Sequence, residues 1–179
     1  MNGGTPSTQK SEYWNGSIPW ITGADIPKQN VLEIRRLITV EAVNNSSINV
    51  IEKGNFLIAT RTGVGKIAIA KFDVAISQDL TGFYVNTAQV LPEYLFRYFD
   101  FHSNILRSLN QGTSIAGITR DVLRSAKLLL PSLKEQCAIA TVLSDMDTEI
   151  AALESRFAKT QAIKQGMMQE LLTGRTRLL

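Results

Sequence analysis

The strongest constraint on the fold is a run of residues, 132–172, that contains no proline and only one glycine, Gly166. Within it, apolar or long side chains recur in alternating steps of four and three residues, the spacing that places them along one face of a helix. These positions are Ile139, Leu143, Met146, Ile150, Leu153, Phe157, Thr160, Lys164, Met167 and Leu171. Ser132 with Glu135 forms a capping-box pair, and Gly174 follows as a C-terminal stop, so the sequence predicts one long helix with defined ends.

This helix is expected to pair with another helix. At about 1.5 Å per residue it is roughly 50 Å long. A small domain cannot cover an apolar stripe that is so long and narrow, and the chain contains no second helix of similar length. The sequence therefore favours a coiled coil with another chain, formed by the seam positions other than Thr160 and Lys164, over a helix that folds back on its own domain.

Residues 1–131 are predicted to form a small β-rich domain. The opening segment, 3–27, is rich in glycine, serine, threonine and proline and predicts a loop system, in which Trp14 and Trp20 act as anchors rather than as stacking platforms for a ligand. Short β-type runs follow, and the turn residues between them favour antiparallel pairing. The predicted strands cover residues 55–60, 66–71, 74–78, 82–87 and 127–131.

Two helical segments interrupt these strands. Pro92 suits the first turn of a helix, and apolar residues recur at helical spacing as far as Gly112. Thr119 is a candidate N-cap for a short helical turn. The expected fold class is therefore α+β: a small mixed or antiparallel β-rich domain over 1–131, followed over 132–179 by one long coiled-coil helix and a short tail.

Composition excludes several classes of protein. No apolar run approaches the roughly 18 residues of a membrane span, and the N-terminus has neither the basic start nor the apolar stretch of a secretory signal. A single cysteine excludes an internal disulfide framework and fits a reducing cytoplasm. With one cysteine and one histidine there is no zinc constellation. The net charge of +3 lies entirely in residues 1–131, a weak indication of a polyanionic partner.

The segment T-R-T-G-V-G-K, residues 60–66, resembles a phosphate-binding loop but fails the test for one. A Walker A loop needs G-x-x-x-x-G-K-[ST], yet Thr60 stands at the first glycine and Ile67 at the final serine or threonine. The segment also leads into a β-type run, so no helix N-terminus meets a phosphate. Its glycines suit the turn of a β-hairpin.

Other catalytic signatures are also absent from the sequence. It has no D-x-K or E-x-K of a magnesium-dependent nuclease, no N/D-P-P-Y/F of an amino-methyltransferase and no G-x-G-x-x-G of a dinucleotide site. His102 is better interpreted as a surface or helix-face histidine than as part of a hydrolase triad. Cys137, although predicted on the first turn of a helix, has no second histidine or cysteine near it in sequence. We therefore interpret the chain as non-catalytic.

Several longer motifs carry a resemblance to a known family. They are GGTPSTQKSEYWNGSIPWITGADI at the start, LIATRTGVGKIAI with AISQDLTGFYV, the run QGTSIAGITRDVLRSAKLLLPSLKEQCAIATVLSDMDTEIAALE, and IKQGMMQELLTGRTRL near the end. Together they span nearly the whole chain. The sequence resembles the DNA-specificity (S) subunits of type I restriction–modification systems.

The resemblance implies a function and a set of partners. A typical S subunit carries two target recognition domains and two long helices that pair antiparallel, and each domain reads half of a bipartite double-stranded DNA site. It docks two modification (methyltransferase) subunits, and motor–nuclease subunits can join. S-adenosylmethionine, ATP and magnesium belong to those partners, so none is expected in this chain.

This sequence departs from the family pattern in two respects. It has one domain and one helix, so it resembles a half-size S subunit that would rebuild the usual arrangement as a homodimer reading an interrupted palindrome. Only two residues precede G-G-T-P, where the family has about 20, so a first element is expected to be missing or supplied by a partner.

The expected DNA contacts lie on polar loops, since polar and basic side chains can meet base edges and phosphates in the major groove. Arg61, Thr62 and Lys66 belong to the segment at 60–66. The other candidates are Thr5, Ser7, Thr8 and Lys10 in the opening loop, together with Gln78, Gln111, Thr113, Ser114 and Thr119. For each residue, a structural role is about as well supported as a base contact.

Two other functional classes stay open. One is a regulatory or anti-restriction protein that occupies modification subunits, or a full-length S subunit, without forming an active complex; the size of the mixed complex would distinguish it. The other is an independent enzyme, which would show turnover without partners and which the missing motifs argue against.

Overall fold

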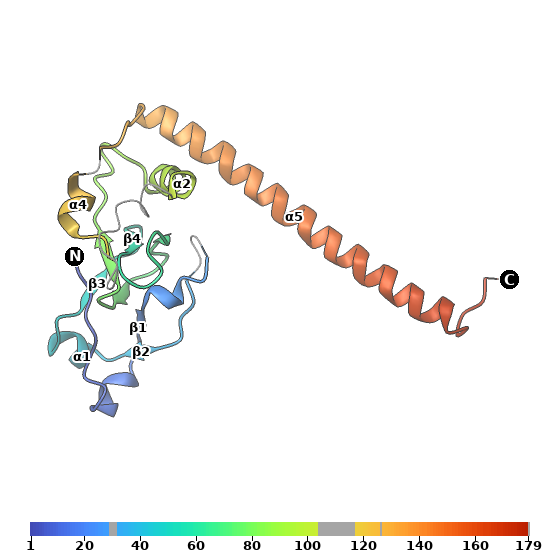
Figure 1. The fold of residues 1–179 in the computed structure, drawn as a ribbon, viewed down its shortest axis with the longest axis horizontal. Coiled ribbons are helices and arrows are strands. Elements are labelled where there is room, and N and C mark those ends of the chain that lie inside the picture. Colours follow the sequence, from blue (N-terminus) through green and yellow to red (C-terminus); the bar gives the residue numbers. More distant parts are fainter. Residues whose placement is uncertain (29–31, 104–116, 126, 179) are drawn as a thin grey trace. The chain divides into compact units, whose positions relative to one another are not determined.

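The computed structural model of the chain describes residues 1–28, 32–103, 117–125 and 127–178 (Figure 1). It divides into a globular unit, Met1–Cys137, and a helical unit, Ala138–Leu179. The expected fold class is confirmed: small mixed and antiparallel sheets precede one long C-terminal helix.

The first sheet of the globular unit has the strand order β2-β1-β6-β3. Its strands are β1 (Ile18–Ile21), β2 (Leu37–Ile38), β3 (Asn49–Ile51) and β6 (Val74–Ile76). β1 and β6 run parallel, whereas the other pairs are antiparallel. A short helix, α1 (Val40–Asn44), begins where the Thr39 side chain accepts a hydrogen bond from the backbone N–H of Ala42. The buried side chains of this region centre on Trp20.

The second sheet is antiparallel throughout, with the order β5-β4-β7. Its strands are β4 (Phe56–Ala59), β5 (Ile67–Ile69) and β7 (Leu80–Phe83). The aromatic face of α2 (Pro92–Phe101) packs against this sheet, with Phe99 and Phe56 ring centroids 6.0 Å apart. A separate apolar cluster draws on strands of both sheets, with Ile21 and Ile76 from the first and Leu57 from the second, so the two sheets share a core.

The first residues of the chain tie the two sheets together. The N-terminal ammonium of Met1 donates to the Gly82 carbonyl, and the Gly82 N–H donates to the Met1 carbonyl. Three residues later the backbone reaches β6, where the Gly4 N–H donates to the Ile76 carbonyl at 2.9 Å. A Cβ at Gly3 would lie 2.1 Å from the carbonyl oxygens of Ile76 and of Ser77, which follows the strand, so only glycine fits there.

Several sequence predictions are confirmed in this unit and others are wrong. β4, β5 and β6 lie within their predicted ranges, but β7 begins two residues before the predicted 82–87. The predicted strand at 127–131 is wrong: none of its residues belongs to a strand, and Leu129 is 88% exposed. The predicted loop system at 3–27 is wrong in part, because β1 lies within it, although the anchoring role of the tryptophans is confirmed. Trp20 is buried, its indole N–H donates to the Gly4 carbonyl at 3.0 Å, and Trp14 packs edge-on against it.

The predicted helices are confirmed within the described residues. α2 begins at Pro92, and the part of that prediction beyond residue 103 lies outside the described residues. α4 (Arg120–Ser125) begins after Thr119, whose hydroxyl accepts a hydrogen bond from the Val122 N–H at 3.4 Å.

The long helix α5 spans Leu133–Leu172. The Ser132 hydroxyl accepts from the Glu135 N–H at 3.3 Å, and Gly174 ends the helix with a φ of +74°. At about 1.5 Å per residue its 40 residues extend about 60 Å, so the expected length of roughly 50 Å was too short. No helix among the described residues is long and apolar enough to cross a membrane.

Candidate functional site

Three connections of the globular unit meet at the loop of residues 60–66. The Thr60 N–H donates to the Asp79 carbonyl at 2.8 Å, and the Thr62 hydroxyl donates to the Asp79 carboxylate at 3.2 Å. Next to Asp79, the Gln78 side-chain oxygen accepts from the Thr5 hydroxyl at 2.5 Å. The β4–β5 loop, the β6–β7 turn and the opening segment therefore lie side by side. We call this group of loops the loop cluster.

Two further segments join the loop cluster through close backbone contacts. A Cβ at Gly23 would lie 2.0 Å from the Thr62 carbonyl oxygen, so the turn at residues 22–25 packs directly on the loop. On the other side, the Ile118 N–H donates to the Thr60 carbonyl at 2.9 Å. Five segments that are distant in sequence are thus brought to one end of the strands.

The loop at 60–66 has the conformation that its glycines allow. Gly63 and Gly65 adopt φ angles of +77° and +89°, in the left-handed region that side chains disfavour. β4 and β5 pair antiparallel on either side, with Ile58 opposite Ile67, so the predicted hairpin is confirmed. The loop leads into a strand rather than a helix, and it therefore lacks the helix N-terminus of a nucleotide-binding loop.

Basic side chains flank this loop. Arg61 is exposed and Lys66 is partly buried, with its side-chain carbons packed beside Gly63. No described residue forms an ion pair with either side chain. The exposed guanidinium of Arg61 can reach an anionic ligand.

A buried carboxylate organises the adjacent turn. Asp25 is fully buried, and its Oδ2 accepts hydrogen bonds from the backbone and the hydroxyl of Thr22, both at 2.8 Å. The same oxygen accepts from Arg36 Nη2 at 2.6 Å, while Oδ1 lies 3.5 Å from Arg35 Nε. Two arginines are thus fixed beside the turn that packs on Thr62.

Sequence reasoning missed this arrangement. Asp25 and the two arginines are separated by ten and eleven residues, and no short-range motif joins them. The adjacent arginines Arg35 and Arg36, in a domain that carries the whole net charge, were the available signal.

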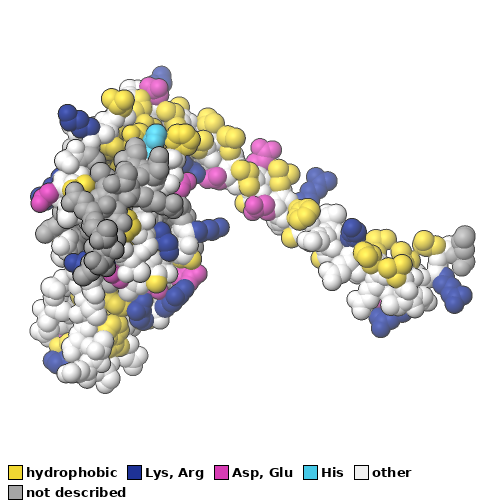
Figure 2. All heavy atoms as spheres, viewed as in Figure 1, with side chains coloured by type: hydrophobic (Ala, Val, Ile, Leu, Met, Phe, Trp, Pro, Cys, Tyr) yellow, Lys and Arg dark blue, Asp and Glu magenta, His cyan; other side chains and the backbone are white. Residues whose placement is uncertain are grey.

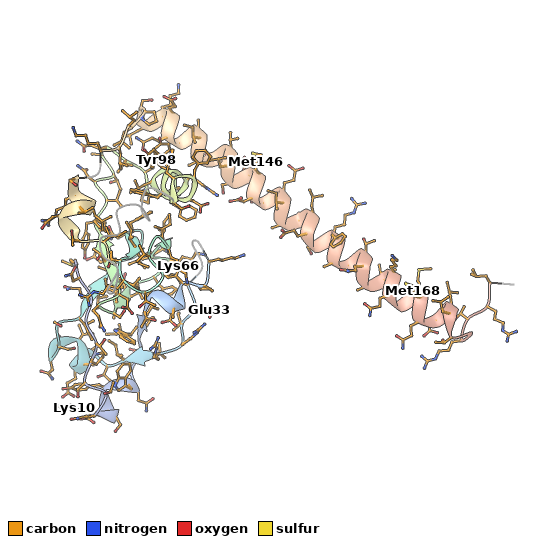
Figure 3. The ribbon with its side chains drawn as sticks, in the orientation of Figure 1. Lys10, Glu33, Lys66, Tyr98, Met146 and Met168 are labelled. Atoms are coloured by element: carbon orange, nitrogen blue, oxygen red, sulfur yellow. The ribbon has the colours of Figure 1, made fainter. Side chains whose placement is uncertain are left out.

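Three of the predicted contact residues lie elsewhere. The Ser7 carbonyl accepts from the Trp14 indole at 3.1 Å, and the Lys10 ammonium donates to the Tyr13 hydroxyl at 2.9 Å, which raises the pKa of Lys10. Figure 3 shows Lys10 at the lower end of the globular unit, well apart from Lys66, which lies near its middle. The structure therefore does not bring Ser7, Thr8 and Lys10 to the loop cluster.

The remaining predicted residues divide into two groups. Thr119 uses its hydroxyl as the N-cap of α4, which gives it a structural role close to the loop cluster. Gln111, Thr113 and Ser114 lie outside the described residues.

The predicted seam of α5 presents apolar side chains to solvent. Ile150, Leu153 and Phe157 are 51%, 56% and 69% exposed. Figure 2 shows hydrophobic side chains spaced along this helix and gathered near its C-terminal end. The gathered group lines a shallow apolar groove formed by Thr160, Ile163, Lys164, Met167, Met168, Leu171 and Leu172. Predicted seam positions therefore lie in one groove with further apolar neighbours.

The described residues offer no metal site, since they contain no group of three or more histidine, cysteine, aspartate or glutamate side chains placed to hold an ion. The loop cluster presents hydroxyl, amide and cationic groups, which suit binding through hydrogen bonds and charge.

Residues 1–165 match the type I restriction modification DNA specificity domain. The chain belongs to this family. The family is one of DNA specificity domains, in agreement with the interpretation of the chain as non-catalytic. Among relatives of this specificity chain, the MjaIX specificity subunit of Methanocaldococcus jannaschii is 35% identical over 150 residues. The EcoR124I/EcoR124II specificity subunit of Escherichia coli is 32% identical over 176 residues.

The specificity chain is shorter than these relatives. The matches cover 81% and 94% of the chain, but only 34% and 41% of the two subunits. Solved structures share its fold over a similar extent. An HsdS subunit from Thermoanaerobacter tengcongensis superposes with a TM-score of 0.68 at 20% identity, covering 94% of the chain and 40% of that subunit. A structure of a type I R-M system gives a TM-score of 0.71 at 22% identity, with the same coverage of both chains.

Proposed function

We propose that this chain recognises double-stranded DNA as the specificity component of a type I restriction–modification complex in the cytoplasm. The globular unit would act as a target recognition domain, and α5 would pair with α5 of a second copy. The assembled dimer would dock methyltransferase subunits and, where they exist, motor–nuclease subunits. S-adenosylmethionine, ATP and magnesium would be held by those partners.

The loop cluster is the observation that carries the DNA-binding part of the proposal. It joins hydroxyl and amide groups, including Thr5, Thr62 and Gln78, with the cations Arg61 and Lys66. Amide and hydroxyl groups suit the donor and acceptor pattern of base edges, and the cations suit phosphates. Because these groups stand on loops that a two-sheet scaffold fixes, they can vary in sequence while their position stays constant.

The charge distribution along α5 favours an antiparallel pair. Residues 138–154 carry four acidic and no basic side chains, whereas 155–179 carry five basic and one acidic. A parallel dimer would place like charges together, and Lys164 of one chain would lie opposite Lys164 of the other. An antiparallel dimer instead sets each basic half against an acidic half. The partner that this helix fits is therefore a second copy in the opposite direction.

An antiparallel dimer would have a defined register. The predicted seam runs from Ile139 to Leu171, so its midpoint is residue 155. Pairing about that midpoint sets Leu143 against Met167 of the second copy, and Leu153 against its Phe157.

Disulfide trapping tests this orientation. We expect a chain with Leu143→Cys to cross-link to a second chain with Met167→Cys when both carry Cys137→Ser and are mixed under mild oxidation. Mass spectrometry of the digested product identifies the bridge. The Leu143→Cys chain alone is the control, and a bridge between two copies of position 143 would contradict the antiparallel arrangement.

Mapping of methylated DNA motifs tests the proposed function as a whole. In cells that contain the modification subunits, we expect this chain to direct methylation to an interrupted palindrome, because two identical readers related by a two-fold axis read inverted copies of one short sequence. A helix of about 60 Å separates their half-sites by at most about 18 base pairs. A non-palindromic site produced with this chain alone would contradict the homodimer. If no new methylated motif appeared, that result would contradict the specificity function.

A further inference from the structure

Arg35 and Arg36 occupy different environments although they are adjacent in sequence. Arg36 Nη2 donates to Asp25 at 2.6 Å and to the Thr22 hydroxyl at 3.4 Å, and its guanidinium lies 4.6 Å from the centre of the Trp20 ring. Through these contacts Arg36 stabilises the turn at residues 22–25. The Arg35 side chain, in contrast, is 54% exposed.

Two carboxylates contact the Arg35 guanidinium. Its Nε lies 3.5 Å from the buried Asp25 Oδ1, an oxygen with no hydrogen-bond partner among the described residues. Its Nε and Nη2 both donate to Glu33 Oε2, with Nε at 3.2 Å. Glu33 is itself positioned by its backbone N–H, which donates to the Asp25 carbonyl at 2.9 Å. The buried carboxylate therefore lies beside the Nε end of the guanidinium, while the exposed Glu33 pairs with both Nε and Nη2.

This arrangement lies next to the loop cluster. Asp25 belongs to the turn whose Gly23 packs on the Thr62 carbonyl oxygen, so Arg35 is held beside the loop that carries Arg61 and Lys66. In Figure 3 Glu33 and Lys66 lie on the same side of the globular unit.

We propose that Arg35 is a further DNA phosphate contact, positioned by buried Asp25 and masked by Glu33 until a phosphate displaces that carboxylate. The inference rests on the proposed function, because it extends the same DNA-binding surface. Glu33 accepts from Nε and Nη2 through one oxygen, whereas a phosphate offers the guanidinium charge-assisted hydrogen bonds to two oxygens. An exposed ion pair such as Arg35–Glu33 contributes little to stability, so its exchange for a phosphate is easy.

The test measures the affinity of the full chain for a duplex of arbitrary sequence over a series of salt concentrations. Phosphate contacts are independent of sequence, and each one contributes about 0.9 to the slope of log affinity against log salt. We expect Arg35→Ala to weaken binding several-fold near 0.1 M salt and to reduce the slope by about one. Glu33→Gln should strengthen binding several-fold, but only while Arg35 is present, so the double variant should bind like Arg35→Ala.

Lys71→Ala is the matched control. Lys71 is exposed and follows β5 at the end remote from the 60–66 loop, where the Gly54 N–H donates to the Ala70 carbonyl. A slope changed equally by both alanine variants would overturn the Arg35 assignment, and so would an unchanged slope in Arg35→Ala. If the wild-type chain binds no duplex at any salt concentration, the proposed function fails and the assignment fails with it.

Discussion

Replacing Gln136 by leucine is expected to lower the free energy of unfolding of the globular unit by about 2–4 kcal/mol. Gln136 is fully buried at the start of α5. Its side-chain oxygen accepts from the Leu91 N–H at 2.9 Å, and its amide nitrogen donates to the carbonyls of Gln89 and Pro131 at 3.0 and 2.9 Å. Leucine has similar volume but leaves all three backbone groups without their partner, and each loss costs about 1–3 kcal/mol before relaxation.

Denaturant unfolding followed by tryptophan fluorescence measures this effect, because both tryptophans lie in the globular unit. Gln165→Leu supplies the same chemical change at an exposed position of α5, where we expect a shift below about 0.5 kcal/mol. An unfolding midpoint of Gln136→Leu equal to that of the wild type would show that the three hydrogen bonds add nothing to stability.

The role of Gln136 illustrates which parts of this protein could be predicted from sequence. The helix α5 was predictable, because a period of 3.5 residues sustained from Ile139 to Leu171 is a local signal with few alternatives. The hairpin at 60–66 was predictable for the same reason, since its glycines and flanking apolar runs are contiguous. The polar sequence around Gln136 predicts an exposed helical turn. Its burial could not be predicted, because Leu91 and Gln89 reach it only in the folded chain.

Errors in the sequence-based fold arose where tertiary contacts outweigh local composition. Glycine, serine and proline surround β1 and predict a loop there, yet its parallel partner, β6, stabilises it as a strand. The apolar run at 127–131 predicts a strand, but Leu128 packs on the core while Leu129 is exposed to solvent. Periodicity is a property of one segment, whereas a strand forms only where a second segment can hydrogen-bond to it and pack beside it.

The candidate site was predictable only in part, for a related reason. The loop 60–66 and Gln78 were identified from polar residues near turns, and the structure brings them together with Thr5. Lys10 is also a basic residue near a turn, but it lies at the lower end of the globular unit in Figure 3, apart from Lys66. Asp25 and its arginines were missed because burial of a carboxylate is a property of the fold and not of the neighbouring sequence.

The second large effect is expected at the centre of the helix seam. Leu153→Asp should convert the proposed dimer into a monomer at micromolar concentration and weaken self-association by at least about a hundredfold. Leu153 is 56% exposed in the single chain and lies two residues from the midpoint of the seam. A two-fold dimer contains the change twice, so two carboxylates would be buried against apolar side chains without a partner. Sedimentation equilibrium or light scattering measures the outcome, and circular dichroism checks that the chain stays helical.

Ser155→Asp is the matched control, because it introduces the same charge two residues away, on the face of α5 opposite the seam. It should leave the dimer intact. A Leu153→Asp chain that remains dimeric would show that the copies associate through another surface or not at all through α5. A monomeric Leu153→Asp chain can still bind single half-sites. Loss of methylation at the interrupted palindrome would then result only from separation of the paired α5 helices. Reading of the bases and spacing of the readers would then be separable functions of the globular unit and of α5.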